Sequence, residues 1–164
     1  MKISYRKALE KDIPVILRFI RELAKYEKLE HEVVASKEAL RKSLFGERPY
    51  AEVVLAEADR KVAGFVLFFH NYSTFLARPG IYIEDLYVKP EYRGKGLGKG
   101  LLSFIASLAL ERDCGRVEWW VLNWNPARKF YDSLGAKAMN EWVVYRLTGD
   151  KINELARSDQ VKNV

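Results

Sequence analysis

Residues 93–98 read Arg-Gly-Lys-Gly-Leu-Gly, and this segment constrains the fold more than any other part of the chain. It follows a β-branched and aromatic run, residues 81–88, that ends at Lys89-Pro90, where proline cannot donate to a sheet ladder. It opens a stretch with helical periodicity to about residue 112, in which one face carries Leu97, Leu101, Leu102, Ile105, Leu108 and Ala109. Glycines at a helix start let backbone N–H groups converge on an anion. The sequence therefore predicts a strand, a pyrophosphate-binding loop and a helix.

Two better-known phosphate-binding loops do not fit this segment. A P-loop starting at Gly94 requires glycine at position 99, which is Lys99. A dinucleotide-binding fingerprint starting at Gly94 or Gly96 requires glycine at position 99 or 101, and these are Lys99 and Leu101. A flexible turn without a ligand stays open as the alternative.

The N-terminal half predicts a short strand, two helices and a hairpin. Residues 3–7 form the strand, and Asp12 is the expected N-cap of a helix whose inward face carries Ile13, Ile16, Leu17, Ile20, Leu23 and Ala24. Ser36 begins a second helix with Ala39, Leu40, Leu44 and Phe45 inward. Strands at 52–58 and 62–71 are joined at residues 59–61, and residues 77–80 give a turn signal.

The C-terminal part predicts further strands around a short helix. A strand is expected at 117–122, and Asn125-Pro126 and Gly135 bracket a helix as N-cap, first residue and C′ residue. Strands are expected at 136–139 and 142–147, and a polar helix at 151–164. The length of 164 residues fits one domain, residues 1–150, with residues 151–164 as its terminal helix or tail.

Composition excludes several classes of protein. The N-terminus lacks the apolar region of a signal peptide and no 18 apolar residues follow one another, so we expect a cytoplasmic protein without a membrane span. Cys114 is the single cysteine, which excludes an intrachain disulfide, and His31 and His70 are isolated, so no metal is expected. The net charge of +6 suits an anionic cofactor or a solvated surface, because Lys and Arg alternate with Glu rather than forming a nucleic-acid-binding stripe.

The pattern Arg93-x-x-Gly96-x-Gly98, after an extended strand and before an amphipathic helix, resembles the acetyl-CoA loop of the GNAT superfamily of N-acetyltransferases. The order of predicted elements over about residues 3–148 is also similar. The resemblance implies an α/β (mixed α+β) GNAT fold: a central, mostly antiparallel mixed sheet of six to seven strands flanked by about four helices.

Three separated segments resemble the diamine and polyamine (spermidine/spermine) acetyltransferases and their thialysine-acetylating relatives. They are residues 22–27, residues 83–88, and Trp124-Asn125-Pro126 through Phe130-Tyr131. One departure is that Asn125 and Tyr131 are six residues apart, one fewer than in those relatives. That spacing weakens the role of Asn125 more than that of Tyr131.

The resemblance implies sites for acetyl-CoA and for an amine. The cofactor-binding set is Leu86, Tyr87, Val88, Arg93, Gly94, Lys95, Gly96, Leu97, Gly98, Asn125 and Tyr131. The substrate-binding set is Tyr26, Glu27, Glu84, Asp85, Glu118, Trp119 and Trp120, whose carboxylates and aromatic faces suit a cationic amine. A tryptophan on a strand is more often plain core, so only one of Trp119 and Trp120 is expected in the pocket.

Two residues are expected to move protons. An alkylamine with a pKa near 10 arrives protonated at neutral pH, and Glu84 is the expected base, acting directly or through a water. Tyr131 is the expected acid for the departing CoA thiolate. The alternatives are a solvent-facing or salt-bridged carboxylate pair, and a pair of core aromatics in Phe130 and Tyr131. Successive strand residues face opposite sides, so Glu84 and Asp85 share a pocket only if a bulge intervenes, and the resemblance implies such a bulge here. Without a shared pocket, Asp85 is expected to have a structural role.

The sequence thus predicts direct transfer of an acetyl group from acetyl-CoA to a primary amine of a small molecule, in a ternary complex. A diamine, a polyamine or a thialysine- or lysine-like molecule is the first expectation for the acceptor. The alternatives are a protein N-terminus or lysine, and a non-catalytic domain that binds CoA or nucleic acid. By resemblance the chain is expected to form a homodimer through its C-terminal strands.

Overall fold

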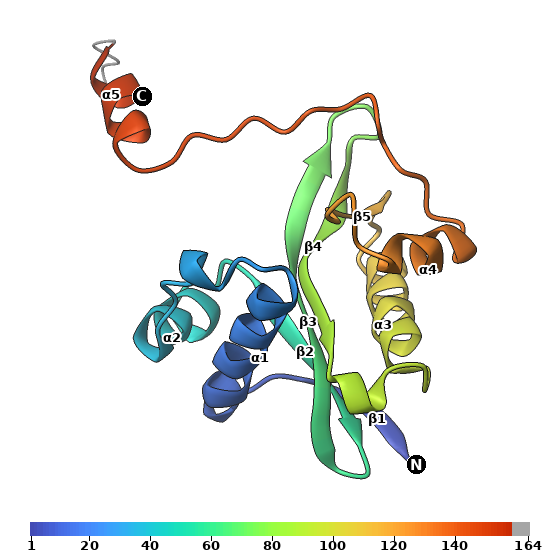
Figure 1. Ribbon diagram of the computed structural model, residues 1–164. Coiled ribbons are helices and arrows are strands. Elements are labelled where there is room, and N and C mark those ends of the chain that lie inside the picture. The colour runs from blue at the N-terminus through green and yellow to red at the C-terminus, as the bar shows by residue number, and fades with distance from the viewer. Residues whose placement is uncertain (159–164) are drawn as a thin grey trace. The chain divides into compact units, whose positions relative to one another are not determined.

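The computed structural model describes residues 1–158 and divides into two compact units, residues 1–122 and the residues from 123 onward. The first unit contains a five-stranded sheet with strands in the order of the sequence (Figure 1): β1 (Ile3–Lys7), β2 (Glu52–Ala58), β3 (Lys61–Ser73), β4 (Arg78–Val88) and β5 (Val117–Trp119). Its helices are α1 (Ile13–Tyr26), α2 (Lys37–Phe45) and α3 (Leu97–Glu111), with 3-10 turns at Glu10–Asp12, Glu30–Glu32 and Pro90–Tyr92. The second unit contains α4 (Ala127–Ser133) and α5 (Asp150–Ser158).

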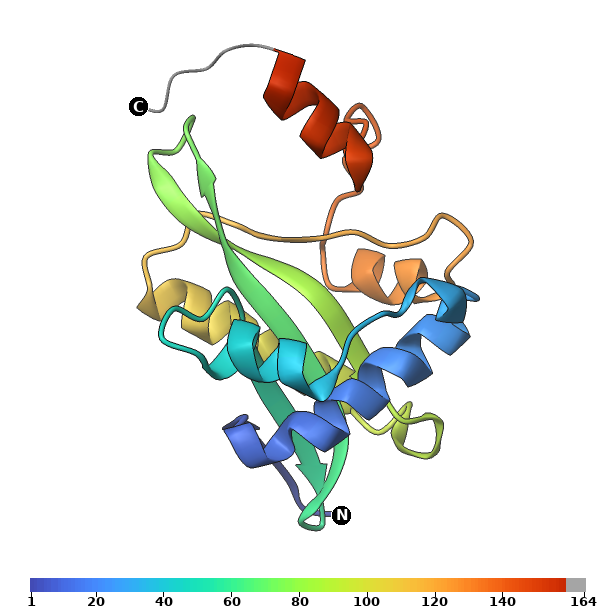
Figure 2. The same ribbon diagram turned by 90° about the vertical axis from the view of Figure 1, so that its left-hand side faces the viewer.

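The sheet is mixed and mostly antiparallel, as predicted. Strands β1 to β4 pair antiparallel with their neighbours, and β4 pairs parallel with β5. Helices α1 and α2 cover one face and α3 covers the other (Figures 1 and 2). The residues described by the structure contain no helix long and apolar enough to cross a membrane.

Each face of the sheet has its own hydrophobic core. The core under α3 is made by Val54, Ala56, Ala58, Ala63, Val66, Phe68, Ile81, Ile83, Val88, Leu97, Leu101, Ile105, Leu108 and Ala109. The core under α1 and α2 is made by Ile13, Ile16, Leu17, Phe19, Leu40, Leu44, Val53, Leu55, Phe65, Leu67 and Tyr87. Because successive residues of β2 enter different cores, this strand is a continuous apolar run rather than an alternating one.

Local signals placed most elements of the first unit correctly. Asp59 and Arg60 both adopt positive φ, at 49° and 66°, and form the turn of the predicted hairpin, with Lys61 already in β3. The Ser36 hydroxyl accepts a hydrogen bond from the Ala39 N–H at 3.1 Å, so the predicted N-cap of α2 is confirmed. In the second unit Gly135 follows α4 at φ 84°, as expected of a C′ glycine.

Three details of the first unit differ from the sequence-based predictions. Asp12 does not cap α1 with its side chain, because its carboxylate binds the Arg6 guanidinium and the Leu9 N–H instead. Ala39 is exposed rather than inward, whereas Leu40 and Leu44 of α2 are buried and Phe45 packs against the same core. The predicted turn at residues 77–80 is wrong, because β4 already begins at Arg78.

The prediction of six to seven strands is wrong, since the described residues form five. The predicted strand 117–122 ends at Trp119, where its pairing with Ile83 of β4 ends. Residues 136–139 and 142–147 form no strand, although they have the composition of strands. A strand requires a neighbour for its backbone N–H and C=O groups, and in the described part of the chain these segments pair with none. Of the helix predicted at 151–164, residues 159–164 lie outside the described residues.

Candidate active site

A β-bulge in β4 brings carboxylates onto the face covered by α1 and α2. Leu67 of β3 pairs with Asp85, but its neighbour Phe68 pairs with Ile83, so Glu84 is the extra residue. In a regular strand, residues four apart point to the same face of the sheet. Here Ile83 lies in the core under α3 and Tyr87 lies in the core under α1, so the bulge between them reverses the faces. The bulge expected from the family is thus present.

Asp85 sits close to two other carboxylates. Burial raises the pKa of Asp85 to about 7, and the negative charges of Glu84 and Glu27 add to this effect. Burial also raises the pKa of Glu27, which directly follows α1. Glu84 is exposed. The fold therefore gathers three predicted substrate-site carboxylates from α1 and β4, and one of them gains a proton near neutral pH.

Aromatic rings lie on the same face of the sheet. The ring centroid of Tyr82 in β4 is 5.1 Å from that of Phe69 and 5.7 Å from that of Trp120, which meets it edge-on. Trp119 instead packs against the core under α3. Of the two tryptophans, Trp120 is therefore the one beside a surface aromatic cluster. The sequence analysis missed Tyr82 and Phe69. Each is next to a core residue of its strand, so the alternation of side chains could have placed both rings on the opposite face of the sheet.

Glu118, predicted in the substrate site, is held by structural partners. Its carboxylate lies 2.9 Å from Nε of Arg116 and accepts a hydrogen bond of 2.8 Å from the Asn71 amide. These two partners hold β5 against β3, and the role of Glu118 in the substrate site stays a prediction.

The predicted cofactor loop lies where β4 ends and α3 begins. The backbone reaches positive φ at Gly94 and Gly96, at 71° and 86°, and Gly96 is the N-cap of α3. A Cβ added at either glycine would meet no atom within 4 Å, so the loop is open on that side. Leu97 is buried below it, and Gly98 lies in the first turn. An open, glycine-lined helix N-terminus fits a pyrophosphate.

The predicted pantetheine strand has a free edge. Strand β5 pairs with β4 only from Ile81 to Ile83, so in the described residues no strand pairs with that side of Leu86, Tyr87 or Val88. A free β edge offers backbone N–H and C=O groups to an amide-containing arm.

Tyr87 is fixed by its surroundings. Its ring is buried 5.5 Å from that of Phe19. Burial raises the pKa of Tyr87 to about 12, and the nearby Glu22 carboxylate adds to this effect. Lys95, in the loop, donates to the Glu91 carbonyl at 2.8 Å.

Asn125 and Tyr131 belong to the second unit. The predicted N-cap at Asn125 is wrong by one residue, because α4 begins at Ala127 and Pro126 is its N-cap. The Asn125 side chain still accepts a hydrogen bond of 2.9 Å from the N–H of Ala127, just before the helix. Tyr131 lies in α4, with its ring 5.6 Å from that of Phe130. Their roles stay predictions.

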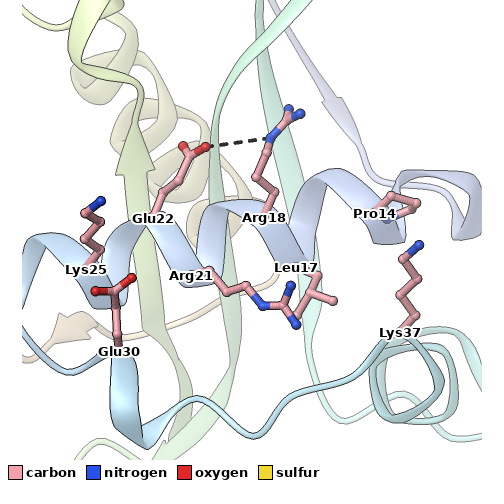
Figure 3. Close-up of a pocket in the computed structure, with 8 residues that line it drawn as sticks. All are labelled: Pro14, Leu17, Arg18, Arg21, Glu22, Lys25, Glu30 and Lys37. Carbon is pink, nitrogen blue, oxygen red and sulfur yellow. Dashed lines mark ion pairs between the residues drawn. The ribbon is translucent and has the colours of Figure 1, made fainter.

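A groove of about 320 Å³ lies along α1 and faces the segment before α2 (Figure 3). Its lining residues are Pro14, Leu17, Arg18, Arg21, Glu22, Lys25, Glu30 and Lys37. Glu22 and Arg18 form an ion pair of 3.8 Å. Most of the charged side chains are exposed and both signs are present, which is typical of a solvated helix face. None of the predicted site residues lines this groove.

Comparison with known proteins decides the family, because residues 17–136 match the acetyltransferase (GNAT) family. The chain belongs to this family. It is an N-acetyltransferase, and the family implies the use of acetyl-CoA.

Named relatives cover nearly the whole chain. Thialysine N-epsilon-acetyltransferase of Bos taurus is 42% identical over 94% of this chain and 97% of its own. L-ornithine N5-acetyltransferase of Arabidopsis thaliana is 35% identical over 92% of this chain and 86% of its own. An integron cassette protein of V. cholerae has a similar structure, with a TM-score of 0.80 and 29% identity over 96% of this chain and 99% of its own. The predicted GNAT fold is confirmed.

Proposed function

We propose that this N-acetyltransferase acts on small amines that carry a second charged or polar group, such as thialysine, ornithine or a diamine. The carboxylates Glu27, Glu84 and Asp85 carry this proposal, because together they attract an ammonium group. The rings of Tyr82 and Trp120 offer apolar and π surfaces on the same face for a short carbon chain. Relatives named for thialysine and ornithine acetylation support this class of acceptor.

Acetyl-CoA is held in this proposal by the glycine loop and by the free edge of β4. The backbone N–H groups of residues 93–98 bind its pyrophosphate, and the backbone of Leu86 to Val88 pairs with its pantetheine arm. The bound thioester supplies the acetyl group.

In the proposed reaction Glu84 removes a proton from the ammonium, and the neutral amine attacks the thioester carbonyl. The amide C–N bond forms, the C–S bond breaks, and Tyr131 donates a proton to the departing thiolate. Glu84 stands at the bulge, exposed, beside the more buried Asp85, so solvent can reach it and a water can relay the proton. Asp85 and Glu27 hold the positive charge of the acceptor in place. Asn125 fixes the start of the helix that carries Tyr131.

The test is a thiol-release assay with acetyl-CoA and a panel of thialysine, ornithine, lysine, spermidine, putrescine and short peptides. Transfer to a small amine but not to peptides supports the proposal, and preference for a peptide would overturn it. Glu84→Gln should lower turnover by about 10²–10⁴ while acetyl-CoA binding is retained. Tyr131→Phe should lower turnover and remove a loss of rate at high pH. If both variants keep parental turnover, neither residue carries the chemistry.

The chain is also proposed to act as a homodimer. Trp142 to Leu147 form an extended apolar segment whose side chains are exposed, and Tyr145 is 93% exposed. Such a segment has both the backbone groups and the apolar surface for pairing with a second copy.

A further inference from the structure

The side chain of Arg93 contacts three residues that belong to two elements, β4 and α1. Its Nε donates a hydrogen bond of 2.9 Å to the carbonyl oxygen of Val88, at the end of β4. Its guanidinium carbon lies 5.0 Å from the ring centroid of Tyr26 and 5.7 Å from that of Tyr87. Both distances fall in the range of a cation–π contact. Arg93 thus connects the start of the glycine loop to the last residue of α1.

The two rings that Arg93 contacts differ in burial. Tyr87 is buried and its ring packs on that of Phe19, so it forms a fixed support for the guanidinium. Tyr26 is at the surface and is 36% exposed, and Glu27 of the carboxylate cluster follows it directly. A change at Arg93 therefore acts mainly on the Tyr26 end of α1.

The other cation of the loop does not make such a connection. Lys95 donates to the Glu91 carbonyl and lies 5.7 Å from the Tyr92 ring, so both of its contacts stay between β4 and α3. Gly94 and Gly96 have no atoms against their Cα positions on the side where a Cβ would stand.

We propose that Arg93 is a positioning residue that couples the two binding sites: when acetyl-CoA orders the glycine loop, Arg93 holds Tyr26, and with it Glu27, in the place that receives the amine. This inference rests on the proposed function of the loop and of the carboxylate cluster. A coupling of this kind is reciprocal, so the amine must raise the affinity for CoA by the same factor.

The test measures binding of the best amine of the panel by calorimetry, with and without saturating CoA. The parent should bind the amine about two- to fivefold more tightly with CoA, the range that a single exposed cation–π contact supplies. Arg93→Ala and Tyr26→Leu should each reduce this ratio to about one, and the double variant should show no further loss.

Two variants separate coupling from mere structure. Tyr26→Phe keeps the ring and should keep the parental ratio. Lys95→Ala removes the same charge from the same loop; it should weaken CoA binding but keep the ratio when CoA is saturating. If Arg93→Ala retains the parental ratio, or if the parent shows no effect of CoA on amine binding, the inference is wrong. A parent that transfers acetyl to no small amine would instead overturn the proposed function.

Discussion

A Cβ added at Gly64 of β3 would lie 2.6 Å from the carbonyl oxygen of Tyr87 in β4. No real Cβ tolerates this distance, and the obstacle is backbone rather than a movable side chain. The two strands approach each other closely at the point where β4 presents its free edge. Gly64 therefore allows Tyr87 to take its position in β4, and the ring of Tyr87 in turn supports the guanidinium of Arg93.

Gly64→Ala should lower the free energy of unfolding by about 1–3 kcal/mol, the usual cost of overpacking. The shifted strand should also bind acetyl-CoA more weakly. Thermal unfolding and calorimetry measure the two effects. Gly98→Ala is the control for stability, because its Cβ would meet nothing nearer than 3.9 Å; it should leave the Tm unchanged or raise it.

Gly96→Asp should abolish binding of CoA, because a carboxylate would stand at the helix N-terminus where the pyrophosphate is proposed to bind. Gly149→Asp is a matched control, since Gly149 also has positive φ and open surroundings. The control also places an aspartate at positive φ, but in the second unit, and it should bind CoA like the parent. Parental CoA affinity in Gly96→Asp would show that the loop has another role.

The acceptor site should depend on pH through Asp85. Its pKa is raised to about 7, so the carboxylate is neutral below and negative above that pH. The kcat/KM for the amine should therefore rise as the pH increases through 7, and Asp85→Asn should remove this rise. Glu27→Gln removes one negative neighbour, which lowers the pKa of Asp85, so the rise should move to lower pH. An unchanged profile in both variants would contradict the carboxylate cluster.

The same carboxylate should affect stability with a defined sign. A carboxyl group whose pKa is raised on folding binds more protons in the folded state, so it destabilises the fold increasingly from its ordinary pKa up to about 7. Asp85→Asn should accordingly raise the Tm at pH 8 and change it little below pH 3.8, the ordinary pKa of the group. Equal shifts at both pH values would mean that ionisation of Asp85 does not matter.

Asp12 should stabilise the fold in the opposite pH range. The Arg6 guanidinium at 2.7 Å lowers the pKa of Asp12, which is 8% exposed and also accepts the Leu9 N–H. Its stabilisation is present above the ordinary pKa of 3.8 and is lost as the pH falls through the lowered pKa. Asp12→Asn should cost about 1–3 kcal/mol at pH 7, a difference that shrinks in acid.

Denaturant titration at pH 7 and in acid measures the Asp12 effect. Glu10→Gln, which loses an exposed pair with Arg41 at 2.8 Å, is the control and should cost less than about 1 kcal/mol. A loss in Asp12→Asn no larger than in this control would mean that the Arg6 pair contributes little.

Sedimentation should give a mass of about twice the 19.0 kDa of one chain. Val144→Glu, in the exposed apolar segment, should shift this mass toward a single chain, because a buried unpaired charge opposes strand pairing. Phe75→Glu, at a 97% exposed position in the turn between β3 and β4, is the matched control and should remain dimeric. A parental mass of one chain at micromolar concentration would contradict the dimer.

The sequence by itself determined the elements whose signals are local. The glycines of residues 93–98, the two-residue turn at Asp59-Arg60 and the Ser36 cap act through φ values and hydrogen bonds within a few residues, so the positions of the loop, the hairpin and α2 could be predicted. The helical periodicity of residues 97–109 fixed which face of α3 enters the core. Family resemblance supplied the bulge at Glu84, which no local pattern showed.

Only the tertiary structure decided which polar groups pair and which strands find partners. Aspartate is a preferred N-cap residue, but the carboxylate of Asp12 accepts hydrogen bonds from Arg6 of β1 and does not cap α1. The carboxylate of Glu118 pairs with Asn71 and Arg116, and the sequence alone predicted neither partner. The coupling of Asp85 to Glu27 joins residues 58 positions apart, which packing of α1 on β4 alone brings together. Residues 142–147 have the composition of a strand and form none, because a strand exists only where another backbone completes its hydrogen bonds.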